Sequence, residues 1–405
     1  MNRFRKLEEV LFFIALHIYM ADMYLEMSVF NITWNRRILQ LIKYSVLLVL
    51  VVKWILCEKW HFKKVLVWGI VFSLCLVLMV VGHYTSLLMA MAMVLSARDI
   101  PFRKILKHVL AAEIIWILLI MLCCFAGLLP DLTFSHEESF AGKLAHTFGF
   151  QYYSNWGDCV LAMIMIWCYL RGRKCTWGEL VLLLLLNHGL YYFHTVSLTY
   201  YGAYAYLFAF VLIVKTGWLR LDGKVWRALC VSVPWVLTAL TLTLVKLYQL
   251  KILRIPAGRL STIRSRFEYT LQAIRTYGFS LFGHDIVQYG NSDLNYRGAA
   301  SGFFLDSGYM YILLAYGTVF ACVLLYLYSL LYLHLWKQGE DLLIAWLTIF
   351  MFMNIVNNFF IDIPNNPLLF LMADALAYSG KLRFPEIGQA LVRRRHARYS
   401  LLKKG

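Results

Sequence analysis

Four arginines lie close together in one stretch of the chain: Arg259, Arg264, Arg266 and Arg275. A guanidinium is a planar fork of donors that stays charged at any relevant pH and binds phosphate oxygens in pairs. The rest of the chain is unusually apolar, with 61% hydrophobic residues. Two interpretations stay open from these residues alone: a site for a lipid-linked phosphate or pyrophosphate, or a helix held to a membrane by anionic headgroups.

The arginines flank an apolar stripe with a helical period. Its members recur at spacings of three and four: Leu260, Ile263, Phe267, Leu271 and Ile274. This pattern predicts an amphipathic helix, which we expect to lie along the membrane surface with its arginines facing headgroups. Arg264 and Glu268 are placed to form an i,i+4 ion pair on that helix.

Two further residues are candidates for acid or base chemistry. Asp306, in "GFFLDSGYMYILLAYG", precedes a long apolar run. Its carboxylate could act as a general base if burial raised its pKa toward neutrality, or it could cap the helix that follows. His146, in "KLAHTFGFQYYSNWGD", could act as an acid or base near neutral pH or serve as an interfacial polar residue. Both alternatives stay open for each residue.

These candidates belong to a chain that consists mostly of apolar runs. The mean hydropathy is +0.66 and only 15% of residues are charged. Runs of about 20 apolar residues are long enough to cross a bilayer core. We place twelve spans at 9–30, 38–57, 65–82, 84–97, 106–129, 153–170, 177–194, 197–215, 228–250, 307–334, 341–361 and 366–379. The sequence therefore predicts an all-α polytopic membrane protein with one integral membrane domain over residues 1–405, whose first span is retained.

Basic residues gather on one side of this layout. The segments on the side of the termini, including the tail 380–405, carry most of the 39 lysines and arginines, which predicts that both termini are cytoplasmic. The net charge of +17 is then topological and indicates no nucleic acid. One large outer loop, 251–306 between spans nine and ten, is basic against this trend. The nine cysteines follow no metal-binding spacing, so we expect no metal site.

Three stretches resemble motifs of the Wzy-type polysaccharide polymerases of bacterial capsule, exopolysaccharide and O-antigen synthesis, which are related to the O-antigen ligases. "RSRFEYTLQAIRTYGFSLFG" resembles the family's arginine-bearing helix that ends in Leu-Phe-Gly, with the family's arginine at Arg266. "LDSGYMYILLAYG" resembles the pattern that enters the next span, with Asp306 and Tyr309 at its fixed positions. "HTFGFQYYSNWGD" is similar to a third pattern, whose asparagine falls on Asn155. The layout, with its large outer loop in the C-terminal half, is similar as well.

The chain departs from the family at two arginines. Ala145 and Leu198 stand where the family has guanidinium groups. If the pyrophosphate is bound as in the family, other cations must replace them. The candidates are Lys143, Arg264 and Arg275.

The resemblance implies a metal-independent glycosyltransferase without a cofactor, at the outer face of the bacterial cytoplasmic membrane. It would transfer a glycan from undecaprenyl pyrophosphate to the non-reducing end of a lipid-linked repeat unit, with a flippase and a chain-length regulator as possible partners. The pyrophosphate and glycan would be bound by Arg266, Arg259, Arg264, Arg275, Asn155 and Tyr309. The acceptor hydroxyl would be activated by Asp306 or His146.

Two other functions stay open. A transporter or a flippase for lipid-linked oligosaccharides also has many spans, although such proteins tend to show repeated halves, broken helices and midplane charges, none of which is evident in the sequence. An O-antigen-ligase-like transferase would move finished glycan to a lipid or protein acceptor. Ligases usually carry a histidine where Asp306 stands, which favours the polymerase.

Overall fold

The structure is a computed structural model that describes residues 2–33, 36–58, 60, 62–135, 144–194, 199–256, 261–288 and 303–377. Helices dominate these residues. The longer ones are α1 (Asn2–Met27), α3 (Arg36–Cys57), α4 (Phe62–Gly82), α5 (Thr85–Ser96), α6 (Phe102–Phe125), α7 (Tyr153–Arg171), α8 (Trp177–His194), α9 (Thr199–Phe210), α10 (Lys224–Gln249), α11 (Ser261–Thr276), α14 (Gly317–Gln338) and α15 (Asp341–Met353). The short ones are α2 (Phe30–Thr33), η1 (Gly172–Lys174), η2 (Val211–Lys215), α13 (Gly308–Leu314), η3 (Pro367–Leu371) and α16 (Met372–Ala377).

The helices form a bundle that fits a helical membrane protein. In the part of the chain that the structure describes, six helices are long and apolar enough to cross a bilayer, namely α1, α3, α4, α6, α10 and α14. The helices α5, α8, α9 and α15 are apolar but shorter. Large hydrophobic side chains are exposed on the outer faces, as for Leu41 (70%) and Val80 (72%), which suits contact with lipid. The nine cysteines are free, and five of them are buried.

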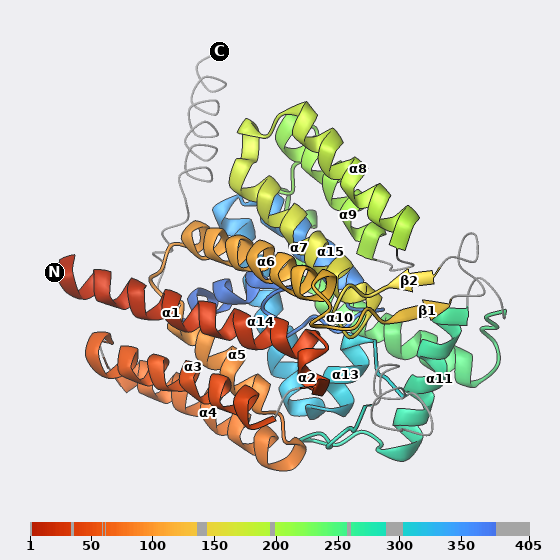
Figure 1. Ribbon diagram of the computed structural model, residues 1–405, viewed down its shortest axis with the longest axis horizontal. Coiled ribbons are helices and arrows are strands. Elements are labelled where there is room, and N and C mark those ends of the chain that lie inside the picture. The colour runs from red at the N-terminus through yellow and green to blue at the C-terminus, as the bar shows by residue number, and fades with distance from the viewer. Residues whose placement is uncertain are drawn as a thin grey trace.

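The helices form two outer groups, one along each edge of the bundle, and a central group between them. Helix α1 packs on α3 and α6, α6 packs on α7, and α10 packs on α14. Figure 1 shows α3, α4 and α5 along one edge of the bundle, α8 and α9 along the opposite edge, and α11 at one end. Buried aromatic side chains fill the centre, where the rings of Tyr309 and Phe360 lie 4.9 Å apart.

The expected span 307–334 is not continuous. Helix α13 ends at Leu314, and α14 begins at Gly317. Gly317 has a φ of +84°, a left-handed conformation that a side chain would strain. A Cβ added to Gly317 would also lie 2.3 Å from the amide nitrogen of Gly283. The break therefore makes room for a segment of the large loop.

The expected span 341–361 also ends early, because α15 ends at Met353. The Asn354 amide donates to the Phe350 carbonyl at 2.8 Å, and its side-chain oxygen accepts from the Phe359 amide at 2.9 Å. Such side-chain bonds compete with the helical ladder. Non-helical backbone within a membrane domain is tolerated where protein covers it. Asn354 and Asn366 meet this condition, since both are 0% exposed.

Helix α11 confirms the helix predicted from the apolar stripe, but its surroundings differ from our expectation. Leu271 is buried, and the ring of Phe267 lies 5.1 Å from that of Tyr248 in α10. Part of the stripe therefore packs on protein, whereas we expected it to lie on the membrane surface. The reason is that α10 and α13 offer apolar partners that the sequence pattern alone does not reveal.

Candidate active site

The site is built around an ion pair between Arg266 in α11 and Asp306 just before α13. The Arg266 Nε donates to the Asp306 Oδ2 at 2.8 Å. The two side chains are only 18% and 30% exposed, so the attraction is less screened by water than a surface pair would be. The N-cap position of α13 belongs to Ser307. Asp306 thus bonds to the arginine and does not occupy the capping position, where the Ser307 side chain makes no cap hydrogen bond.

A second donor of the same guanidinium is available in the site. The Arg266 Nη1 is buried and has no hydrogen-bond partner among the residues that the structure describes. Leaving a buried donor unpaired costs about 1–3 kcal/mol. A ligand oxygen at this position would remove that cost, and an anionic oxygen would gain a charge-assisted bond.

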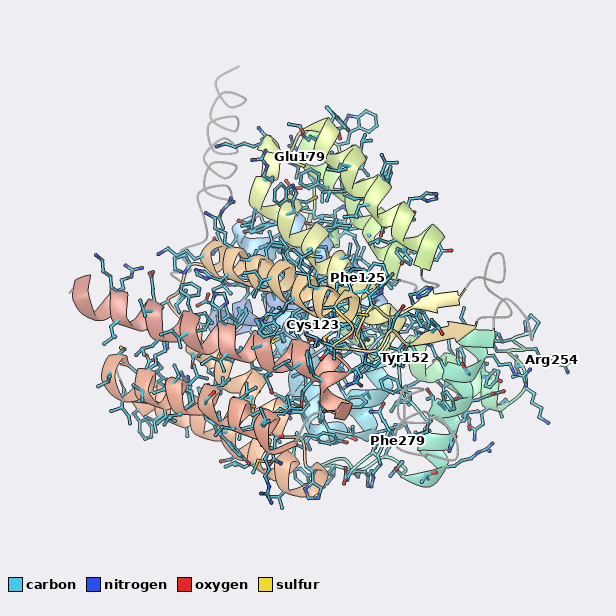
Figure 2. All side chains as sticks on the ribbon, viewed as in Figure 1. Cys123, Phe125, Tyr152, Glu179, Arg254 and Phe279 are labelled. Atoms are coloured by element: carbon cyan, nitrogen blue, oxygen red, sulfur yellow. The ribbon has the colours of Figure 1, made fainter. Side chains whose placement is uncertain are left out.

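Tyr152 lies beside the pair, at the residue that precedes α7. Burial, together with the charge of Asp306 and against that of Arg266, raises the pKa of Tyr152 to about 12. Its hydroxyl therefore keeps its proton at neutral pH and can act as a donor. Figure 2 marks Tyr152 between the helix bundle and the end that carries α11. The sequence analysis missed this residue, although a tyrosine next to the Asn155 motif was a visible signal.

Two glycines, Gly283 and Gly317, allow the large loop to pack closely against the break between α13 and α14. Gly283 has a φ of +76°, and a Cβ added there would lie 1.9 Å from the Ala315 carbonyl oxygen. The backbone amide of Thr318 donates to the Ser280 carbonyl at 2.9 Å, and its hydroxyl donates to the same oxygen at 3.0 Å. The stretch that holds Arg266 and the stretch that holds Asp306 are thereby joined at a second point.

The α4–α5 turn fixes the next part of the loop. The Tyr84 hydroxyl donates to the His284 carbonyl at 2.7 Å and accepts from the Ile286 amide at 3.2 Å. His83 Nε2 lies 4.0 Å from the Asp285 carboxylate. Residues 280–286 of the loop therefore have fixed positions against both the centre and one edge of the bundle.

Of the other predicted arginines, two lie within the described residues. Arg264 forms the expected pair with Glu268 at 2.8 Å, at an exposed position, and this prediction is confirmed. Arg275 is exposed in the last turn of α11, next to its final residue. Arg259 lies outside the described residues, as do Lys143 and Leu198. Of the three arginines that lie within the described residues, Arg266 is the one that the structure places against Asp306.

Tyr309 and Asn155 have structural contacts. The Tyr309 side chain is 0% exposed, and its hydroxyl donates to the Met351 carbonyl at 3.1 Å. Its side chain therefore packs in the centre of the protein, close to Asp306 in the sequence. The Asn155 amide donates to the Met27 carbonyl at 3.2 Å and ties the start of α7 to the end of α1. Both residues hold the walls of the site in this structure.

His146 lies on a small β-hairpin, formed by β1 (Thr133–Ser135) and β2 (Leu144–His146). Its Nδ1 lies 2.5 Å from the Asp131 Oδ2, and its ring stacks on Phe148. The other oxygen of Asp131 accepts from the amides of Thr147 and Phe148. Asp131 thus anchors the hairpin and orients the histidine, a partnership that the sequence analysis did not foresee.

Three carboxyl groups of the bundle interior, two of them buried and one partly buried, were also missed. Asp22 of α1 and Glu113 of α6 are 1% and 0% exposed, and Asp362, which follows α15, is partly buried. Each has at least one buried oxygen without a hydrogen-bond partner in the described part of the chain. Single acids inside apolar runs were the available signal, since ionisable residues at membrane depth are rare and usually functional.

The fold and site together indicate a helical membrane protein with a half-buried arginine and carboxylate pair where its large loop meets the bundle. No known protein family, curated protein or solved structure matches the chain. Among the described residues, no group of three or more His, Cys, Asp and Glu side chains is arranged to hold a metal ion.

Proposed function

We propose that this protein is a Wzy-type polysaccharide polymerase at the outer face of the bacterial cytoplasmic membrane. It would transfer a glycan from undecaprenyl pyrophosphate to the non-reducing end of a lipid-linked repeat unit. The single observation that carries this proposal is the Arg266 guanidinium, which bonds to Asp306 through Nε and keeps a buried, unpaired Nη1. The same guanidinium thus contacts the candidate base, Asp306, and offers an unpaired buried donor to an anion.

The reaction needs one bond to form and one to break. The acceptor hydroxyl oxygen attacks the anomeric carbon of the donor sugar, and the bond from that carbon to the pyrophosphate oxygen breaks. Undecaprenyl pyrophosphate leaves with the electron pair, and the hydroxyl proton passes to the Asp306 carboxylate. Preplaced donors stabilise the charge that develops on the leaving oxygen, because they need no reorganisation during the step.

Arg266 and Tyr152 are the donors that the site offers to the pyrophosphate. A guanidinium can bond to a carboxylate and a phosphate at once, since its five N–H groups point in different directions. The protonated Tyr152 adds an uncharged donor beside it. Exposed Arg264 and Arg275 would attract the anionic carrier without direct contact at the reacting atoms.

The topology in this proposal places α11 and the large loop outside the membrane and both termini inside. The donor and acceptor would reach the site after a flippase has moved them outward, and a chain-length regulator would set how often the step repeats. The lipid carrier and the bilayer are then the immediate surroundings of the site.

The test is complementation of cells that depend on this chain for polymer. Arg266→Ala should abolish polymer and leave single lipid-linked repeat units, while membrane levels of the protein stay normal by immunoblot. Arg254→Ala is the matched control, because Arg254 is an exposed arginine of the same loop that lies at the outer edge of the molecule (Figure 2). Polymer of unaltered length with Arg266→Ala would overturn the proposal.

A further inference from the structure

A cavity of about 710 Å³, with both polar and apolar lining, lies between α1, α3 and the α4–α5 turn. This volume falls in the range of roughly 300–1,000 Å³ that is usual for small-ligand sites. The polar side chains that line it are Glu26, Asn31, Gln40, Lys43, His83 and Thr85. Apolar side chains, among them Leu47, Met79 and Leu88, line the remainder.

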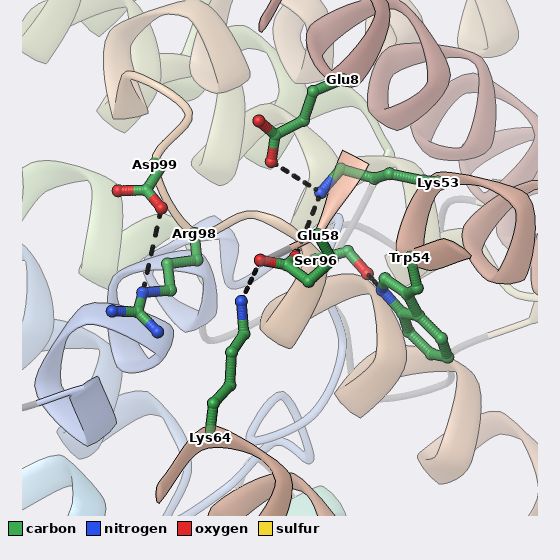
Figure 3. A network of polar contacts seen from close by, with 8 residues as sticks. All are labelled: Glu8, Lys53, Trp54, Glu58, Lys64, Ser96, Arg98 and Asp99. Carbon is green, nitrogen blue, oxygen red and sulfur yellow. Dashed lines mark hydrogen bonds and ion pairs between the residues drawn. The ribbon is translucent and has the colours of Figure 1, made fainter. Parts of the chain in front are cut away.

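The walls of the cavity are joined at one end by aromatic and polar contacts. There, the Trp54 ring of α3 contacts the rings of Trp68 and Phe72 of α4, at 5.3 and 5.5 Å. Figure 3 shows the polar contacts at the same end: Lys53 with Glu8 and Glu58, Lys64 with Glu58, and Trp54 with Ser96. Helix α3 also packs on α1 and on α5, and α4 packs on α5. Toward the other end the cavity is lined by Leu39, Lys43 and Leu47 of α3 and by Met79 of α4.

The charges in the cavity cancel. Lys43 forms an ion pair with Glu26, so the one lysine is already matched by a carboxylate. The other polar groups are two amides, a hydroxyl and an imidazole, and Tyr44 adds an aromatic ring. Such a lining offers hydrogen bonds to hydroxyl groups and apolar contact to C–H faces. It suits uncharged sugar residues and does not suit a pyrophosphate.

Two connections link this cavity to segments of the Arg266 and Asp306 site. The Gln151 amide donates to the carbonyls of Glu26 and Ser28, at 2.7 and 2.9 Å, and the next residue is Tyr152 of the site. On the other side, His83 of the cavity lies 4.0 Å from Asp285, which follows the docked Gly283 segment. The end of α1 and the α4–α5 turn, which line the cavity, therefore contact the segments that lead to Tyr152 and to the docked part of the loop.

We infer that this cavity binds sugar residues of the acceptor glycan and so presents its terminal hydroxyl to Asp306. This rests on the proposed polymerase function and adds to it a separate subsite for uncharged sugars. The pyrophosphate stays with Arg266, and the acceptor sugars occupy the space between α1, α3 and α4.

The experiment measures protection of an introduced thiol on the purified protein. Gln40→Cys places the thiol on the cavity wall, and Leu41→Cys places it on the adjacent residue, which is 70% exposed and does not line the cavity. The probe is the repeat-unit glycan released from its lipid by mild acid. At about ten times its Kd, the glycan should slow maleimide labelling at position 40 about tenfold, because roughly one site in ten is empty. Labelling at position 41 should not change.

Peptide mass spectrometry reads the two positions apart from the nine native cysteines. Undecaprenyl phosphate without sugars is the second probe. Protection by this lipid and not by the free glycan would overturn the inference in favour of a lipid-chain site, and protection by neither would overturn it outright. The same measurement with Arg266→Ala should still show protection by the glycan. Failure of the polymerase proposal is read separately, from polymer in cells that carry Arg266→Ala without the introduced thiol.

Discussion

Arg266→Lys is the substitution that best separates a pyrophosphate-binding guanidinium from a structural one. Lysine keeps the positive charge but replaces the fork with a single ammonium group. In the structure, the Arg266 Nε is occupied by Asp306 while Nη1 stays buried and unpaired. A lysine ammonium at this position can bond to Asp306 or to the phosphate. It cannot make both bonds in the directions that the guanidinium Nε and Nη1 provide.

The expected loss follows from the number of donors removed. One preplaced donor to a developing anion contributes about 10²–10³ in rate, or roughly 2.7–4 kcal/mol. We therefore expect Arg266→Lys to lower the turnover rate by about 10²–10³ and to leave the fold intact, because the ion pair to Asp306 can be kept. A purely electrostatic role would be preserved, since the charge is unchanged.

The assay is laddering of polymer by the purified protein in lipid nanodiscs with lipid-linked repeat units. Turnover is measured at saturating substrate, and melting temperature in the same discs reports folding. Arg254→Lys is the control, since it makes the same change at an exposed position of the same loop. Turnover of Arg266→Lys close to that of the unaltered protein would refute the assignment of Nη1 to the leaving group.

Three further outcomes are expected. Gly283→Ala should lower the melting temperature more than Gly278→Ala, because both have positive φ but a Cβ lies 1.9 Å from a backbone carbonyl oxygen only at Gly283; equal shifts in thermal unfolding would contradict the docking. Burial raises the pKa of Tyr152 to about 12 in the folded protein, whereas the pKa of an unfolded tyrosine is near 10. The neutral hydroxyl therefore contributes its full stability below about pH 10, and this contribution is lost as the pH rises from about 10 to 12. Tyr152→Phe should flatten this part of the curve of unfolding free energy against pH, and an unchanged slope would contradict it. Glu113→Gln should leave polymer ladders unchanged, since an ion-coupled transporter and not a polymerase needs an intramembrane carboxyl to change charge; loss of polymer would count against the proposed mechanism.

Local pattern was sufficient for some elements of this protein. Helix α11 follows from an apolar period of three and four, and the pair of Arg264 and Glu268 follows from their spacing on that helix. Long apolar runs indicated the membrane-type helices α1, α3, α4, α6, α10 and α14. In each case the signal and the structure that it predicts lie within one segment of about 15–25 residues, on the scale of a single helix.

The features that sequence reasoning missed depend on partners far along the chain. The end of α13 at Leu314 requires Gly283 to dock beside it, and Gly317 by itself does not identify that distant partner. The cavity requires α3 and α4 to close at one end and part at the other. Tyr152 enters the site because Gln151 is tied to the end of α1. Such contacts are set by packing and not by the pattern of any one segment.

The spacing of the two motif stretches has a geometric cause. Arg266 and Gly283 are 17 residues apart (283 − 266), and their respective partners, Asp306 and the backbone around Gly317, are 11 apart (317 − 306). Between these partners lies α13, whose seven residues span about 10 Å at 1.5 Å per residue. The loop therefore grips α13 at both ends, and a residue inserted into α13 would disturb one contact if the other were kept. The position of the Arg266 and Asp306 pair is thus set by its distance from the contact between Gly283 and the backbone around Gly317.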